Sequence, residues 1–181
     1  MTTNDKRIIL AIVSLFLTSA AMGRNVPTVR WGHQLMSETD DVPRSAVVDS
    51  NDDIYFVVQT SKGVFFLKYN QQGDQLWSKP LDPEVKFVTG LSADNQGNIY
   101  VTGLAESTPQ RKTKGEADAC IAKYDQTGTQ LWVRLVGTPK DDFCGSLAVD
   151  AEGNLYVSGF TLGDFAKPNK GGQDAFVAAY S

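Results

Sequence analysis

The chain has 181 residues, of which 17 are basic, 21 are acidic and one is histidine, giving a net charge of −4. This balance leaves no basic surplus for a phosphate backbone, so we exclude a nucleic-acid binder. Its length and its 41% hydrophobic content are sufficient for one globular domain with a buried core.

The first 23 residues have the pattern of a secretory signal peptide. Lys6 and Arg7 precede an apolar run over residues 8–22, which ends in small residues at 19–21. The run is shorter than the ~20 residues of a transmembrane helix, and an uncleaved N-terminal anchor is the alternative. We therefore predict a signal peptide at 1–23, a mature domain at 24–181, and a secreted, periplasmic or cell-surface location.

The mature chain repeats one turn-and-strand motif three times. The copies start 45 and 56 residues apart, close to the period of propeller blades. In each copy we expect the first aspartate to accept backbone hydrogen bonds across a tight turn. We expect Gly97, Gly153 and, in the first copy, Asp52 to take the left-handed position, and the strand that follows to be buried on both faces. The copies are DSNDDIYFVV at 49–58, DNQGNIYVTG at 94–103 and DAEGNLYVSG at 150–159.

Two further strands follow each of the first two copies. Segments 65–73 and 120–128 carry Lys-Tyr before a glycine turn, and segments 75–81 and 130–135 then carry Gln-Leu-Trp. Polar and apolar residues alternate around each Trp, which predicts a strand with one wet face. Segment 29–36 has the same character, so we predict another outer strand there. Four strands with a buried centre and a wet outer strand are typical of a propeller blade.

The pattern D-x-x-G-N-[IL]-Y-V-[TS]-G, followed by D-A-x-[IV]-A-x-Y and G-x-Q-L-W, resembles the bacterial beta-propeller repeat family of seven-bladed propellers. The resemblance covers about residues 29–181, and Asp52 and Val58 depart from it where the other copies have glycine. It implies an all-β fold of blades with four antiparallel strands. It also implies exported or surface-attached proteins with no common activity.

The strand count predicts about three blades, at about residues 37–81, 82–136 and 137–181, with strand 29–36 as an additional outer strand. Closed propellers typically have about 4–8 blades, so we expect an incomplete or open propeller. A partial chain and an open three-blade wedge both fit this count. Two wedges would complete each other by self-association through their open end blades.

Segment 125–132, DQTGTQLW, is similar to the tryptophan-docking motif of quinoprotein propellers, with one residue fewer between aspartate and threonine. That motif is structural, so no quinone cofactor follows from it. We expect Trp132 to pack between blades and its replacement by alanine to destabilise the protein by about 3–5 kcal/mol.

No pattern in the sequence indicates catalysis, a cofactor or a metal, so we predict no enzyme. His33 is expected at the surface, and Asp141 and Asp142 are expected to cap a turn. Residues 49–53 begin like a calcium loop but lack the glycine and glutamate that complete one, which favours a hydrogen-bonded hairpin.

Cys120 occupies the position that Phe65 and Phe176 hold in the other copies, so we expect a small buried hydrophobic residue. Export would permit a disulfide between Cys120 and Cys144. Free thiols are the alternative.

These features favour an exported, non-catalytic propeller-repeat protein that acts as a scaffold or interaction surface. A protein or glycan partner is expected at the variable loops 104–118 and 162–173. The alternatives are a fragment of a propeller enzyme, such as a lyase or a quinoprotein-like dehydrogenase, and a carbohydrate-binding surface module that uses exposed aromatics such as Phe165.

Overall fold

The computed structural model describes residues 11–12, 29–34, 40–81, 85–105 and 118–181. These residues form strands and turns, and no helix long and apolar enough to cross a membrane occurs among them. Most of the predicted signal peptide and most of the loop predicted at 104–118 lie outside the described residues.

The described strands fall into three sheets and one short pair. Blade 1 has the order β3-β4-β5-β6, blade 2 the order β7-β8-β9-β10, and blade 3 the order β11-β12-β13, while β1 pairs with β2. The strands are β1 (Ala11–Ile12), β2 (His33–Gln34), β3 (Val42–Val48), β4 (Ile54–Thr60), β5 (Gly63–Tyr69), β6 (Gln75–Pro80), β7 (Val85–Ala93), β8 (Ile99–Ala105), β9 (Asp118–Tyr124), β10 (Gln130–Val136), β11 (Asp142–Val149), β12 (Leu155–Thr161) and β13 (Asp174–Tyr180).

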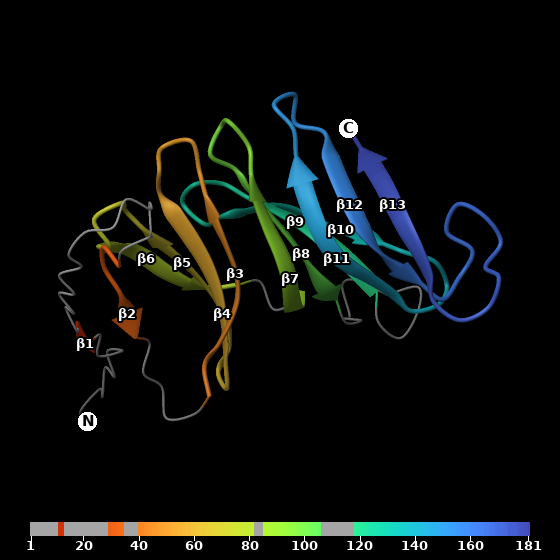
Figure 1. Cartoon of the computed structure of the whole chain (residues 1–181), viewed down its shortest axis with the longest axis horizontal. Helices are drawn as coiled ribbons and strands as arrows, with labels where there is room; N and C mark the ends of the chain where they lie inside the picture. Colours follow the sequence, from red (N-terminus) through yellow and green to blue (C-terminus); the bar gives the residue numbers. More distant parts are fainter. Residues whose placement is uncertain (1–10, 13–28, 35–39, 82–84, 106–117) are drawn as a thin grey trace, which may run out of the picture.

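All neighbouring strands are antiparallel, so the predicted all-β fold of propeller-type blades is confirmed. Figure 1 shows the three blades side by side in an open row, with blade 1 and blade 3 at opposite ends. The first strand of each blade lies innermost, and β7 contacts both β3 and β11. The described blades therefore form an open row, as expected of part of a propeller.

The repeated turn forms because its aspartate replaces missing backbone partners. Asp94 Oδ1 accepts the backbone N–H groups of Gln96 and Asn98, each at 2.9 Å. Gly97 takes the predicted left-handed conformation with φ 78°, and Asp52 does the same in the first copy with φ 61°. This confirms the reading of the motif as a hairpin turn.

A tyrosine of the strand that follows donates a hydrogen bond to the same carboxylate. The hydroxyl of Tyr55 donates to Asp49 Oδ2 at 3.1 Å, and the hydroxyl of Tyr100 donates to Asp94 Oδ2 at 3.2 Å. Burial raises the pKa of Tyr55 to about 12, so its phenol keeps the donated proton at neutral pH. The motif thus couples the turn to the core between the blades.

The core lies between the blades. The face of blade 1 that carries Tyr55, Val57 and Phe66 packs on the face of blade 2 that carries Ile99 and Val101. Blade 2 then presents its opposite face to blade 3, and the residues of this second cluster are Tyr100, Ala119, Ile121, Val136, Cys144, Leu147, Leu155, Val157 and Phe176. Blade 2 is therefore buried on both faces, as its apolar central strands predict.

Trp77 packs at the outer edge of the contact between blade 1 and blade 2. Its ring centroid lies 5.2 Å from that of Phe66 and 6.0 Å from that of Tyr55. The indole rests on the β9–β10 turn, where a Cβ at Gly128 would lie 2.9 Å from the ring. Gly128 is needed for its φ of 79° and also for the close approach of the tryptophan.

Trp132 is less enclosed by neighbouring blades than the sequence predicts. It packs at the margin of the second cluster, with its ring 6.1 Å from Tyr100. Within the described part of the chain, no hairpin of a following blade covers it as the Gly128 turn covers Trp77. Packing between blades is therefore correct for Trp77 and only partly correct for Trp132.

Both cysteine side chains are buried and no disulfide joins them, so the pairing that export would permit is not present. Burial, with a smaller contribution from the Asp142 carboxylate, raises the pKa of Cys144 to about 12, which makes it an inert core residue. Asp142 itself is buried and its Oδ2 accepts the backbone N–H of Thr138 at 2.5 Å, so it caps a turn as predicted.

We expect Trp77→Ala to lower the free energy of unfolding by about 3 kcal/mol, because it removes a ring enclosed by two blades. Trp132→Ala should cost only about 1 kcal/mol, since less of its area is lost from the core. Urea unfolding of the two variants measures the difference. Equal losses would contradict the described packing.

The Asp94 turn should also contribute to acid sensitivity. Burial raises the pKa of Asp94, but the hydrogen bonds from Asn98 and Gln96 and the charge of Lys123, 3.6 Å away, outweigh burial, so the net pKa is lowered. A carboxyl with a lowered folded-state pKa stabilises the protein above its unfolded pKa of about 3.9. This stabilisation is lost as pH falls through the folded pKa.

Asp94→Asn should therefore lower the free energy of unfolding at pH 7 by about 1–3 kcal/mol and flatten its dependence on pH below about pH 4. Urea unfolding at pH 7 and at pH 3 tests this. Glu152→Gln, at an exposed turn position, is the control and should behave as the parent. An unchanged pH dependence in the Asp94 variant would contradict the assigned role.

Candidate functional site at the open third blade

A tryptophan followed two residues later by a donor side chain occurs three times in the chain. The pairs are Trp31 with His33, Trp77 with Lys79, and Trp132 with Arg134. We call each pair a latch, because in the first two the pair holds the β-hairpin turn of the next blade. The role of these three donors was not predicted from the sequence, although they share the same spacing from a tryptophan.

The first latch holds blade 1. The indole Nε1 of Trp31 donates to the carbonyl of Gln71 at 3.1 Å, and its ring stacks on Tyr69 with centroids 6.1 Å apart. His33 Nε2 lies 2.5 Å from the carbonyl oxygen of Gly73 and donates to it. The prediction that His33 lies at the surface is wrong, because this contact half-buries the ring against the turn.

The second latch joins blade 1 to blade 2. Lys79 Nζ donates to the carbonyl of Thr127 at 2.6 Å, in the turn on which Trp77 rests. The same ammonium lies 5.7 Å from the centroid of the Trp77 ring. A charged donor on a turn carbonyl and an indole over a glycine therefore act together on one hairpin.

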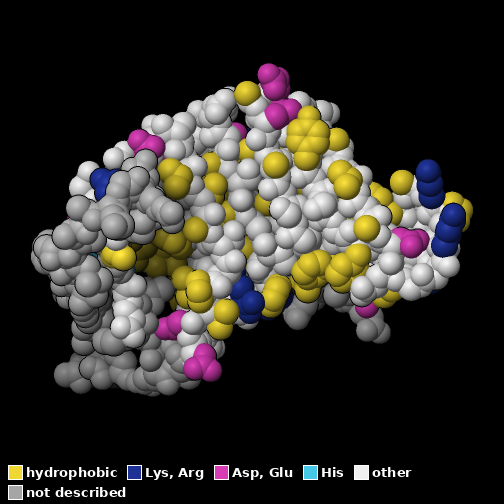
Figure 2. Space-filling view, viewed as in Figure 1, with side chains coloured by type: hydrophobic (Ala, Val, Ile, Leu, Met, Phe, Trp, Pro, Cys, Tyr) yellow, Lys and Arg dark blue, Asp and Glu magenta, His cyan; other side chains and the backbone are white. Residues whose placement is uncertain are grey.

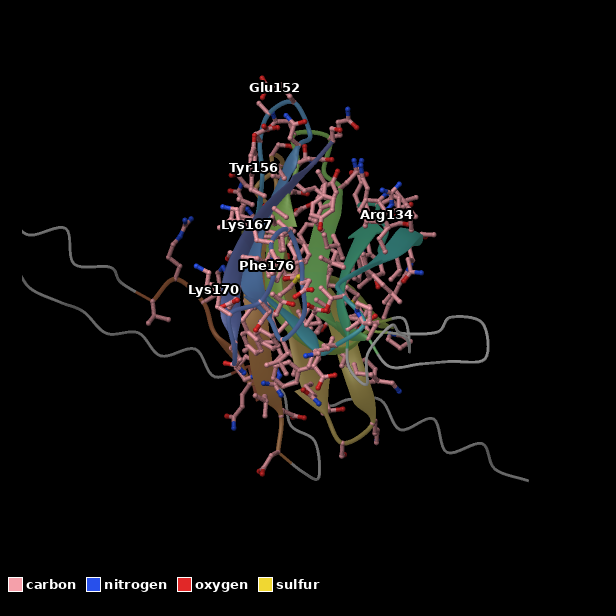
Figure 3. The ribbon with its side chains drawn as sticks, turned by 90° about the vertical axis from the view of Figure 1, so that its right-hand side faces the viewer. Arg134, Glu152, Tyr156, Lys167, Lys170 and Phe176 are labelled. Carbon is pink, nitrogen blue, oxygen red and sulfur yellow. The ribbon has the colours of Figure 1, made fainter. Side chains whose placement is uncertain are left out.

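The third latch is open. The Arg134 guanidinium lies 5.8 Å from the centroid of the Trp132 ring, which repeats the arrangement of Lys79 on Trp77. Beside it is a cavity of about 380 Å³. Arg134 lies on β10 and is visible when the molecule is viewed from its blade 3 end (Figure 3). The cavity is lined by Tyr100, Trp132, Arg134, Leu155, Tyr180 and Ser181, among others.

The outward side of blade 3 forms an apolar end face, which we define as Tyr156, Ser158, Ala175, Val177 and Ala179. All five side chains are exposed, and among the described residues no strand pairs with the free edge of β13. Tyr156 lies on this end of the molecule in Figure 3.

Equivalent positions in the other blades are buried. The exposed fraction of the motif tyrosine is 0% at Tyr55, 4% at Tyr100 and 45% at Tyr156. The corresponding third-strand residue is exposed by 80% at Val177, against 2% at Ile121. The expectation that the strand after the motif is buried on both faces is therefore wrong for the third copy, because no blade covers it.

The loop predicted as a partner site at 162–173 lies at the same end of the molecule. Asp164 Oδ1 accepts the backbone N–H of Asn169 at 2.8 Å, and Asn169 Oδ1 accepts that of Gly171 at 2.7 Å. These bonds give the loop a defined shape that exposes Lys167 and Lys170 (Figure 3). Figure 2 shows dark-blue side chains projecting at this end.

Phe165 is not an exposed aromatic platform. Its ring stacks on Phe176 with centroids 4.4 Å apart, and the side chain is half-buried. The sequence-based choice of Phe165 for sugar stacking is therefore wrong, because the loop folds the ring back onto β13.

The Asp49 carboxylate, which resembles a calcium ligand in sequence, is engaged within its turn. Its Oδ1 accepts the backbone N–H groups of Asn51 at 2.8 Å and of Asp53 at 3.0 Å. Across the described ranges, no group of three or more His, Cys, Asp or Glu side chains converges on one point.

Comparison with known proteins gives a family-level match. Residues 131–166, which include Trp132 and the third copy of the motif, match the family described as beta-propeller repeat. The regulatory protein FlaEY of Caulobacter vibrioides is 28% identical over 94 residues, which is 48% of this chain and 10% of that protein. A crystal structure of a protein of unknown function from Bacteroides caccae aligns with a TM-score of 0.47 and 13% identity, over 80% of this chain and 48% of that chain.

The chain thus spans about a tenth of the length of FlaEY and about half of the Bacteroides protein. The match at 131–166 covers the strand that carries the third latch and the turn that follows it. The recognition made from the sequence motifs is confirmed: this chain carries a repeat of the beta-propeller repeat family.

Proposed function

We propose that this chain is an exported, non-catalytic propeller-repeat protein that serves as a scaffold or interaction surface. The observation that carries the proposal is the apolar end face of blade 3, whose equivalents in blades 1 and 2 are buried contacts. A surface that exposes a valine by 80% beside an exposed tyrosine is suited to docking.

The use of the repeated polar residues supports a non-catalytic role. The carboxylates of Asp49, Asp94 and Asp150 each accept two backbone N–H groups within their own turns. The latch donors His33 and Lys79 contact turn carbonyls. These side chains stabilise the hairpin turns. This structural role accounts for the recurrence of the same residues in the repeat, so no catalytic role is needed to explain it.

Export is supported by the sequence at the N-terminus. Lys6 and Arg7, the apolar run over 8–22 and the small residues at 19–21 fit a signal peptide. Outside the cell, the lysines of loop 162–173 would attract acidic partners, and the apolar end face would bind an apolar surface.

Export can be tested by expressing the whole chain in a bacterial host and determining the mass of the protein in each compartment. We expect a processed form that begins at Met22 or Arg24, outside the cytoplasm. Leu10→Arg, in the apolar run, should keep the unprocessed chain inside. A full-length product in the cytoplasm for both chains would contradict export.

The scaffold role can be separated from a ligand-binding role by thermal unfolding of the exported protein with calcium and with a panel of glycans. We expect the melting temperature to stay within about 1 °C, because a ligand that does not bind the folded protein does not stabilise it. A rise of several degrees with one ligand would contradict the scaffold role and favour a binding module.

A further inference from the structure

We propose that two copies of this chain associate through the outer edge of blade 2, with β10 of one copy pairing antiparallel with β10 of the other. This surface is separate from the end face of blade 3, and it belongs to the blade that has a neighbour on each side. The inference goes beyond the scaffold role, because it names a surface and a partner that do not depend on export or on the end face.

Strand β10 is the last strand of its sheet. It pairs with β9 on one side, and no described strand pairs with its other edge. The backbone N–H and C=O groups along such an edge can pair with a strand of another chain. In Figure 3, Arg134 of β10 lies at the margin of the molecule, away from Tyr156 and Lys167. On the described residues, the outer edge of blade 2 is therefore open to a second molecule.

The equivalent strand of blade 1 has a protection that β10 lacks. Both strands begin with Gln-Leu-Trp, but β6 continues as Ser-Lys-Pro and β10 as Val-Arg-Leu-Val. Proteins commonly use lysine and proline to block a sheet edge, because a charge that must lose its water and a missing N–H both oppose pairing. β10 contains neither residue, and Arg134 is its one charged side chain. Of the two outer strands, β10 is therefore the one suited to pairing edge to edge.

An exposed leucine gives this edge an apolar anchor. The side chain of Leu131 is 51% exposed. Val133 and Leu135 lie on the same face of β10, partly buried against the core between blades 1 and 2. A strand that pairs with β10 would cover Leu131 and extend this apolar face outward.

The sequence of β10 is complementary to itself. A two-fold axis at Val133 pairs all of β10, from Gln130 to Val136, with the same strand of the second copy. This register places Leu131 opposite Leu135 of the other copy, so the exposed leucine meets an apolar side chain on both sides of the axis. Each copy uses the same edge, so the contact is closed and yields a dimer instead of a fibre.

Charge favours the same register. With the axis at Val133, Arg134 of one copy lies opposite Trp132 of the other. Within one chain the Arg134 guanidinium already lies 5.8 Å from the centroid of the Trp132 ring, so a second indole offers a favourable partner for the cation. An axis at Arg134 would instead oppose two guanidinium groups, which is unfavourable.

The test is sedimentation velocity of the protein recovered from the bacterial host, over a range of concentrations. We expect a dimer that dissociates on dilution, because one seven-residue edge is a small interface. Leu131→Lys should raise the dissociation constant at least about 10-fold, because pairing would then desolvate a charge beside Leu135 of the other copy. The exposure of Leu131 lets the subunit keep its fold, which thermal unfolding checks.

Leu76→Lys is the matched control, because it makes the same change at the equivalent position of β6. Leu76 is 49% exposed, so the two variants differ in which edge they alter and not in burial. The control should leave the dissociation constant unchanged. A protein that is monomeric at all concentrations, or equal effects of the two variants, would overturn the inference.

Hydrogen exchange of the unmodified protein locates the contact without any substitution. The amides of β10 should exchange more slowly as the protein concentration rises, because pairing protects the outer edge, while those of β6 should not change. A dimer in which β10 exchanges at the same rate at every concentration would show that the copies meet elsewhere, and would overturn the pairing of β10.

Discussion

The structure depends on one contact, in which a tryptophan from the outer strand of one blade lies over a glycine turn of the next. A blade buries its faces only against neighbouring blades, so its stability is a matter of nearest-neighbour contacts. Trp77 over Gly128, with Lys79 on the Thr127 carbonyl, joins the outer hairpins of blades 1 and 2. The turn aspartates and their tyrosines order the neighbouring hairpin turns at the same end of these blades, where Gln71 donates to Asp52 at 2.7 Å.

The same contact explains why the two ends of the described chain differ from its middle. Trp31 and His33 hold the turn of blade 1 from a segment that is not part of any of the three blades. Trp132 and Arg134 have no such turn beneath them among the described residues, and a cavity lies beside them. Within the described residues the contacts at Trp31 and Trp77 are thus equivalent, and the surface beside Trp132 and Arg134 is the basis of the proposed interaction surface.

The sequence predicts most of the local structure, because turn chemistry acts over a few residues. The motif aspartates, the left-handed Asp52 and the alternating outer strands were all predictable from spacing and residue type. The exposure of Tyr156 was not, since burial depends on which blade lies opposite in space. His33 was misplaced for a related reason: its partner is the Gly73 carbonyl, 40 residues away in the chain.

A double-mutant cycle on Trp77 and Gly128 tests the central contact most directly. Gly128→Ala imposes a left-handed alanine and a collision with the indole, and Trp77→Ala removes only the collision. We predict that Gly128→Ala costs at least about 1 kcal/mol more in the parent than in the Trp77→Ala protein. Gly153→Ala, with φ 89° and no atom within 4 Å, should show no such coupling to residue 77. Additive losses for Trp77 and Gly128 would contradict the account.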